Sequence, residues 1–434
     1  MKKSVFGIFL VVMCLVLFNK ITYDVLIVGG GASGTMAGLQ AARMGSKVMI
    51  AEETVWIGGM LTSAGVSAID GNYRLRGGLF GEFTDALAEH YGGYEALKTA
   101  WVSNIMFEPS VGEAIFEQKV AAEKNITLCK EWRFESAQKT KKGWTVIFST
   151  PEGKKSIDTR ILIDGTELGD VAKACGIKYH IGFDPKSYTG EKMAFEDARN
   201  IVQDLTMVMT LKDYGPGADM TIEKPEGYDI NNYVNCCINP LNTYFEKDQR
   251  QWSPEMMLSY GQLQNGKIMI NWPTEGNDFY ANVIEMNREQ RDSVIAQAKL
   301  RTLGFLYFIQ TELGYKNLGL ADDEYPTEDK LAFFPYHRES RRTEGEYLFT
   351  VDEVENRYDF KGYRTGVAVG DYPVDHHHYA CPEWKTYAHL WFAPVPSFTL
   401  PVGTLVPLGV EDFIVAEKSI SVSNLVNGTT RLQP

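Results

Sequence analysis

Residues 23–34 read Tyr-Asp-Val-Leu-Ile-Val-Gly-Gly-Gly-Ala-Ser-Gly, and residues 48–52 read Val-Met-Ile-Ala-Glu. The first stretch is an apolar run that leads into a glycine turn, and an apolar-periodic segment joins it to the second. A strand, a glycine turn, a helix and a second strand that ends in an acid form the unit that holds a dinucleotide. The order of these features predicts a Rossmann-like nucleotide-binding unit at this point of the chain.

Glycine has a separate role at three points of this turn. Gly29 allows the tight turn, Gly31 lets the backbone approach a pyrophosphate, and Gly34 lets the helix pack against the strand, because none of them carries a Cβ. Ala32 and Ser33 begin the helix, and its first amides face the phosphates with the positive end of the helix dipole.

The acid that ends the second strand is Glu52, which lies 18 residues beyond Gly34, close to the usual spacing of about 20. Its carboxylate can accept hydrogen bonds from the two hydroxyls of a ribose, and it would repel a phosphate on that ribose. The apolar run at residues 25–28 suits a strand buried on both faces of a parallel sheet. A glycine turn without a nucleotide is therefore the less favoured interpretation.

Two further segments resemble flavoproteins of the glutathione-reductase type. Residues 56–62, Trp-Ile-Gly-Gly-Met-Leu-Thr, resemble the second glycine pair that these proteins place after the ribose-binding acid. Residues 164–170, Asp-Gly-Thr-Glu-Leu-Gly-Asp, follow a strand expected at 156–163 and resemble the turn that closes their FAD site. The resemblance favours FAD over NAD. It implies cofactor contacts at Gly58, Gly59, Met60, Asp164, Gly165, Thr166 and Asp170.

A narrower resemblance runs from about Thr22 to the last residue. It rests on residues 107–116, 164–170, 334–342 and 419–431, and the Pro-Tyr-x-Arg-Glu-Ser-Arg-Arg pattern that begins at Pro335 is its more specific mark. Together these segments resemble the bacterial FAD-dependent oxidoreductase family related to the flavoprotein subunit of heterodisulfide reductase. The resemblance implies FAD and redox chemistry and leaves the substrate undefined. Members of that family continue into a further helix rich in glycine and alanine, so we expect this chain to be truncated at its C-terminus and to bind FAD more weakly.

Length and composition set limits on function. With 434 residues, 44% of them hydrophobic, the chain can form two or more lobes with sizeable cores. Its net charge of −13 argues against binding to nucleic acid and to anionic lipid. None of its six cysteines forms the Cys-x-x-Cys spacing of an iron-sulfur site. The adjacent Cys236 and Cys237 are either a redox dithiol or, in the favoured interpretation, buried thiols.

The first residues are interpreted separately from the fold. The basic leader Met-Lys-Lys-Ser precedes an apolar run at residues 5–18, which is typical of a signal-peptide core and short for a membrane span. Residues 19–22 offer no small-x-small cleavage site, so an uncleaved anchor competes with a signal peptide. We expect residues 1–21 to be one of the two. The protein would then be exported, either periplasmic or membrane-anchored, and would contact the membrane only through this segment.

The remaining chain divides into three parts. Residues 22–183 form the first part of an FAD-binding domain, residues 184–330 a substrate domain punctuated by prolines, and residues 331–434 the second part of the FAD-binding domain. The elements expected within them are helices at 76–100, 113–124 and 287–312, a strand at 126–128 and a hairpin at 133–149. The predicted fold class is α/β, a Rossmann-like parallel sheet with a β-hairpin and an inserted α+β substrate domain.

The candidates for catalysis begin with residues 336–342, Tyr-His-Arg-Glu-Ser-Arg-Arg. In an extended chain His337, Glu339 and Arg341 would point to one face. Arg338 and Arg341 could orient a substrate and stabilise negative charge, and His337 could move a proton near neutral pH. An Arg–Glu ion-pair network between the lobes would use the same residues without catalysis. The sequence leaves these two interpretations evenly weighted.

Three of the seven histidines follow one another at residues 376–378. One of them could transfer a proton near the flavin, His376 and His378 could share a metal ion on one face of a strand, or the segment could be an ordinary polar loop. Metal sites usually need further spaced ligands, and only Asp371, Asp375 and Cys381 lie near in sequence. We therefore place His376 and His378 among the catalytic candidates and assign no metal site from the sequence.

The predicted function is that of an FAD-dependent oxidoreductase that transfers hydride between a small organic substrate and flavin N5. A hydroxyl-bearing, sugar-like molecule would suit the polar, aromatic-rich second lobe. The first alternative is an electron-transfer flavoprotein subunit that passes electrons to an acceptor protein, as the heterodisulfide reductase resemblance implies. The second is a truncated nucleotide-binding protein without catalysis.

Overall fold

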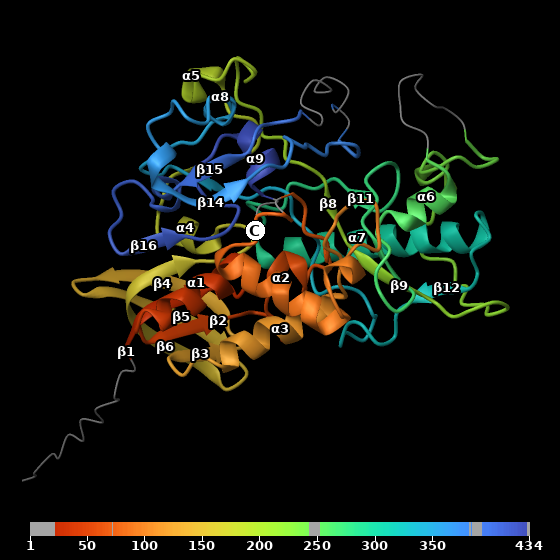
Figure 1. The fold of residues 1–434 in the computed structure, drawn as a ribbon, viewed down its shortest axis with the longest axis horizontal. Coiled ribbons are helices and arrows are strands. Elements are labelled where there is room, and N and C mark those ends of the chain that lie inside the picture. Colours follow the sequence, from red (N-terminus) through yellow and green to blue (C-terminus); the bar gives the residue numbers. More distant parts are fainter. Residues whose placement is uncertain (1–21, 72, 243–251, 382, 384–392, 432–434) are drawn as a thin grey trace, which may run out of the picture.

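The computed structural model describes residues 22–71, 73–242, 252–381, 383 and 393–431 (Figure 1). The apolar run at residues 5–18, on which the prediction of export rests, lies outside these residues. Within the described part of the chain, no helix is both long enough and apolar enough to cross a membrane.

The main sheet has seven strands in the order β3-β2-β1-β6-β5-β4, with β16 also paired to β6. Five of these strands are parallel: β1 (Thr22–Val28), β2 (Val48–Ala51), β3 (Ile126–Cys129), β6 (Gly153–Asp164) and β16 (Phe413–Val415). The hairpin of β4 (Arg133–Thr140) and β5 (Gly143–Thr150) continues the sheet in antiparallel fashion. The α/β fold class and the hairpin are therefore confirmed.

Helices cover the parallel part of this sheet. The helix α1 (Ala32–Arg43) packs on β1 and β2, while α2 (Gly78–Tyr91) and α3 (Pro109–Ala121) form the next layer. The approach of α1 to β1 depends on Gly34, because a Cβ there would lie 2.2 Å from the backbone oxygen of Gly29. The start of α3 is four residues earlier than the sequence pattern suggests, since Pro109 takes the first helical position.

A second group of elements lies to the right of the sheet in Figure 1. Its long helix, α7 (Arg288–Thr311), begins at a capping box formed by Asn287 and Gln290, as the sequence predicts to within a residue. The helix contributes Phe305 and Phe308 to a core that also holds the strands β9 and β12. The other elements of this group are β8 (Leu205–Thr206), β9 (Met209–Asp213), α6 (Pro254–Ser259), β10 (Lys267–Ile270), β11 (Asp278–Phe279) and β12 (Leu318–Leu320).

The C-terminal part of the chain returns to the sheet above its carboxyl edge (Figure 1). It supplies β16 and ends with α9 (Asn424–Thr430), which is almost entirely buried. The remaining short elements are α4 (Asp170–Ala174), β7 (Tyr179–His180), α5 (Lys186–Thr189), β13 (Arg342–Thr343), α8 (Val351–Glu355), β14 (Gly366–Gly370) and β15 (Phe398–Pro401), of which β13 pairs with β7 and β14 with β15. Segments far apart in sequence therefore meet at the carboxyl end of the parallel strands, where ligands bind in open α/β sheets.

Candidate functional site

The glycine turn after β1 is held against two other motifs that the sequence singles out. Gly29 has a φ of +96°, and a Cβ there would lie 2.2 Å from the oxygen of Gly165. The Gly58 amide donates to the Gly30 oxygen at 2.8 Å, and Gly31 forms a bridge with Gly58. The three segments expected to contact the cofactor thus converge on one edge of the sheet.

Glu52 lies at the end of β2 and is bonded to this turn. Its Oε2 accepts from the Gly30 amide at 2.7 Å, and its Oε1 accepts from the amide and hydroxyl of Thr54 at 2.8 and 2.9 Å. Burial raises the pKa of Glu52 to about 7, although these hydrogen bonds act to lower it. Each carboxylate oxygen has two acceptor positions. The side chain is fixed where a ribose diol could also donate to it.

Asp164 and Asp170 hold the local backbone. Asp164 Oδ1 accepts from the Thr166 amide at 2.9 Å, and Oδ2 accepts from the Ala172 amide at 2.7 Å. Burial raises the pKa of Asp164 to about 6. Asp170 pairs with Arg291 at 2.7 Å and with Arg341 at 2.8 Å. These acids shape the turn that places Gly165 against Gly29, and their carboxylates are engaged by the protein itself.

Sequence reasoning missed an acid from the last strand of the sheet. Glu417 follows β16, and its Oε1 accepts from the Ser33 amide in the first turn of α1 at 3.2 Å. A Cβ on Gly31 would lie 2.4 Å from the same oxygen. Burial is the main cause that raises the pKa of Glu417 to about 7. The feature of the sequence that could have indicated this acid is the short apolar run at residues 413–415, which is followed after Ala416 by the charged pair Glu417 and Lys418.

The same edge of the sheet also contains an ion pair. Lys418 contacts Glu167 at 2.5 Å, and a Cβ on Gly59 would lie 3.0 Å from a carboxylate oxygen of Glu167. The arrangement fits FAD, because the N-terminus of α1, a glycine cradle and a ribose-binding acid are present together. Gly29, Gly31, Ala32, Ser33, Gly34 and Glu52 would hold the nucleotide, and Gly58, Gly59 and Met60 would border it.

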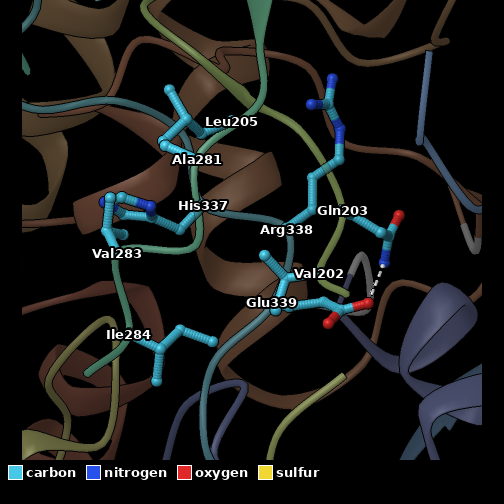
Figure 2. Close-up of a pocket in the computed structure, with 9 residues that line it drawn as sticks. All are labelled: Val202, Gln203, Leu205, Ala281, Val283, Ile284, His337, Arg338 and Glu339. Carbon is cyan, nitrogen blue, oxygen red and sulfur yellow. Dashed lines mark hydrogen bonds between the residues drawn. The ribbon is translucent and has the colours of Figure 1, made fainter. Parts of the chain in front are cut away.

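His337 lies between this edge and a small pocket. The pocket is lined by Val202, Gln203, Leu205, Ala281, Val283, Ile284, His337, Arg338 and Glu339. Burial lowers the pKa of His337 to about 4, and the charges of Glu167 and Lys418 act on it in opposite directions. Figure 2 shows the imidazole beside Val283, whereas Glu339 points to Gln203. The shared face expected for His337 and Glu339 is therefore wrong.

The arginines of the same segment are buried in ion pairs. Arg338 donates to the Asp204 backbone oxygen at 2.7 Å and pairs with Asp278 at 3.2 Å. Besides Asp170, Arg341 pairs with Glu285 at 2.9 Å. These contacts match the ion-pair interpretation, although with more aspartates than expected. A direct contact between Arg338 or Arg341 and a substrate stays a prediction.

The three consecutive histidines lie in two different surroundings. His377 Nε2 lies 2.8 Å from Asp375 Oδ2, and Asp375 lies 3.6 Å from Arg431. His376 and His378 are fully buried and lie close to Glu339. Their roles in proton transfer stay predictions.

The vicinal cysteines lie away from this edge, in the core of the second group of elements. Both are buried, with their sulfur atoms 3.6 Å apart. Their position fits the interpretation as buried thiols.

Solved structures that resemble this chain include p-nitrophenol 4-monooxygenase PnpA from Pseudomonas putida DLL-E4, with 12% identity over 44% of this chain and 49% of that chain (TM-score 0.31). A flavoprotein/dehydrogenase from Cytophaga hutchinsonii shows 16% identity over 44% of this chain and 47% of that chain (TM-score 0.32). OxyS anhydrotetracycline hydroxylase from Streptomyces rimosus shows 16% identity over 48% of this chain and 39% of that chain (TM-score 0.31). The chain spans about half or less of the length of each.

A family model described as FAD dependent oxidoreductase matches residues 24–434, which is nearly the whole described structure. The match includes the glycine turn, Glu52 and the last strand with Glu417. The chain therefore belongs to the FAD-dependent oxidoreductase family, with FAD as its cofactor.

Proposed function

We propose that this enzyme oxidises a small hydroxyl-bearing, sugar-like substrate by hydride transfer. FAD supplies the hydride acceptor at flavin N5. The observation that supports the proposal is the place of His337, which borders a pocket on one side and the Glu167–Lys418 pair of the cofactor edge on the other. A group in that place can hold a substrate hydroxyl and accept its proton as hydride leaves the adjacent carbon.

Other residues of the pocket would orient the substrate. Gln203 and Glu339 are joined by a hydrogen bond of 3.2 Å, and Arg338 is fixed by its bonds to the Asp204 oxygen and to Asp278. The apolar part of the lining consists of Val202, Leu205, Ala281, Val283 and Ile284. Fixed polar groups together with aliphatic ones suit a small polar molecule more than a hydrocarbon.

The test is a screen for flavin reduction without oxygen. Purified protein that shows the flavin spectrum is mixed with sugars, polyols and hydroxy acids, and the loss of visible absorbance is followed. We expect at least one of these to bleach the flavin, and His337→Gln to slow bleaching by about 10²- to 10⁴-fold. His90→Gln, on an exposed face of α2, is the control. If none of these compounds bleaches the flavin, the dehydrogenase proposal fails.

The resemblance of the sequence to the heterodisulfide reductase flavoprotein subunit motivates a second candidate, an electron-transfer subunit. The sequence contains no Cys-x-x-Cys, so electrons would have to pass to an acceptor protein that carries its own clusters. Reduction of the flavin by a reduced partner protein, together with no response to small hydroxyl compounds, would favour this candidate.

A further inference from the structure

Three ligand-type side chains meet next to the pocket, and one of them also lines it. They are Glu339, His376 and His378, and one donor atom from each lies within 4.8 Å of the other two. Glu339 is 3% exposed, and both histidines are 0% exposed. Two segments that are separated by more than thirty residues therefore bring a carboxylate and two imidazoles together in the interior.

Two atoms of this cluster are buried without a partner. Among the residues that the structure describes, neither Glu339 Oε2 nor His376 Nδ1 makes a hydrogen bond. A buried polar atom without a partner costs roughly 1–3 kcal/mol. Both atoms belong to residues of the same cluster, so one ligand bound there could satisfy them together.

The remaining polar atoms are held in the manner of metal ligands. His376 Nε2 is 3.3 Å from the Leu425 backbone oxygen, so a proton on Nε2 is donated there and the lone pair stays on Nδ1. Glu339 Oε1 accepts from Asn424 at 2.9 Å and from Gln203 at 3.2 Å. Imidazole that donates one nitrogen to a carbonyl, and carboxylate held by amides, are the usual outer contacts of bound metal ions.

The arginines near the cluster have acidic partners of their own. Arg342 pairs with Asp184 at 2.9 Å, and Arg431 lies 3.6 Å from Asp375. The only member of the cluster that can carry a negative charge is Glu339.

We propose that Glu339, His376 and His378 bind a divalent transition-metal ion, with Zn²⁺ as the best match. Two imidazoles and one carboxylate suit zinc, which completes a tetrahedron with a water molecule. Zinc ligands about 2.0–2.2 Å from the ion lie roughly 3.4 Å apart, so the donor atoms, which lie within 4.8 Å of one another, would close by at most about 1.4 Å on binding. The ion would tie the segment that carries His337 to the loop that carries Asp375 and to the start of α9. No metal site is assigned from the sequence, so this proposal goes beyond the sequence analysis.

Metal binding by the wild-type protein is tested first. Protein stripped with a chelator is titrated with ZnCl₂ in competition with a chromophoric chelator, and the metal that remains after gel filtration is measured by mass spectrometry. We expect one zinc per chain and a higher melting temperature with zinc than without it. CoCl₂ should give the visible bands of tetrahedral Co²⁺. Wild-type protein that takes up neither ion would overturn the proposal.

Variants then assign the ligands. His376→Gln and Glu339→Gln should lower zinc affinity by more than about 100-fold, and Asn424→Ala, which removes an outer contact, by about 10- to 100-fold. His377→Gln is the matched control, because this neighbour faces Asp375. Ligand variants that keep wild-type affinity would contradict the assignment. If a ligand variant does not fold, the Co²⁺ spectrum of the wild type remains as the test. Bands of tetrahedral Co²⁺ bound by nitrogen and oxygen support the site, and the absence of binding contradicts it. None of these readouts depends on flavin reduction.

Discussion

The acid at the N-terminus of α1 should make FAD binding depend on pH. Glu417 Oε1 accepts from the Ser33 amide, which is a group that a bound diphosphate would also use. The pKa of Glu417 is raised to about 7. A carboxyl group with a raised pKa favours the folded state most at low pH, and that contribution is lost as the pH rises through about 7. FAD brings negative charge to the same place, so it should bind best when Glu417 is protonated.

The size of the effect follows from Coulomb's law. Two unit charges about 5 Å apart repel by about 1 kcal/mol with the dielectric constant of water and about 3 kcal/mol with a value near 20. These energies correspond to roughly 5- to 150-fold in affinity. Between pH 6 and pH 8.5, the dissociation constant of FAD for the wild type should therefore rise by a factor in this range.

Equilibrium dialysis or quenching of flavin fluorescence, repeated across this pH range, measures the dependence. Glu417→Gln keeps an acceptor oxygen on the helix and removes the charge. The variant should bind FAD with little pH dependence and more tightly than the wild type at pH 8.5. Glu411→Gln, on an exposed residue just before β16, is the control and should keep the wild-type curve. Parallel curves for the wild type and Glu417→Gln would refute the reasoning.

Three further predictions concern the turn, the buried ion pairs and the N-terminal segment. Gly29→Ala places a Cβ 2.2 Å from the Gly165 oxygen at a φ of +96°, so we expect loss of FAD from the purified protein and destabilisation by about 1–3 kcal/mol in urea unfolding. Arg338→Met leaves Asp278 buried without its ion pair and should cost about 3–5 kcal/mol in the same assay, whereas a cost below 1 kcal/mol would count against the pair. From the apolar run at residues 5–18 we expect a tagged protein to fractionate with the membrane or the periplasm, and recovery in the cytoplasm with an intact N-terminus would contradict this.

The sequence predicts best those features that neighbouring residues determine. The glycine turn and the strand before it are confirmed because the steric need for Gly29 and Gly34 can be read from a few adjacent positions. The long helix α7 is confirmed nearly to the residue, since the capping pair Asn287 and Gln290 is local as well. Such features depend on contacts within one or two turns of the chain.

The candidate site escapes sequence reasoning where its contacts join distant segments. Ser33 and Glu417 are separated by 384 positions, and nothing in either local sequence reveals that they meet. The alternation expected for residues 336–342 fails for a related reason. Partners from other segments fix these side chains: Asp278 holds Arg338 and Gln203 holds Glu339, so tertiary contacts override the period of an extended strand.

One short segment links the cofactor edge to the interior. On one side of residues 336–342, His337 lies near the Glu167–Lys418 pair, and on the other side Glu339 lies with His376 and His378. Its arginines have their charges matched by buried or half-buried acids, so the segment has little freedom to move without breaking several ion pairs at once. In the proposed reaction, a segment fixed in this way would hold His337 at a constant distance from the flavin, as hydride transfer requires. The ion pairs and the histidines would then serve one purpose, the positioning of His337.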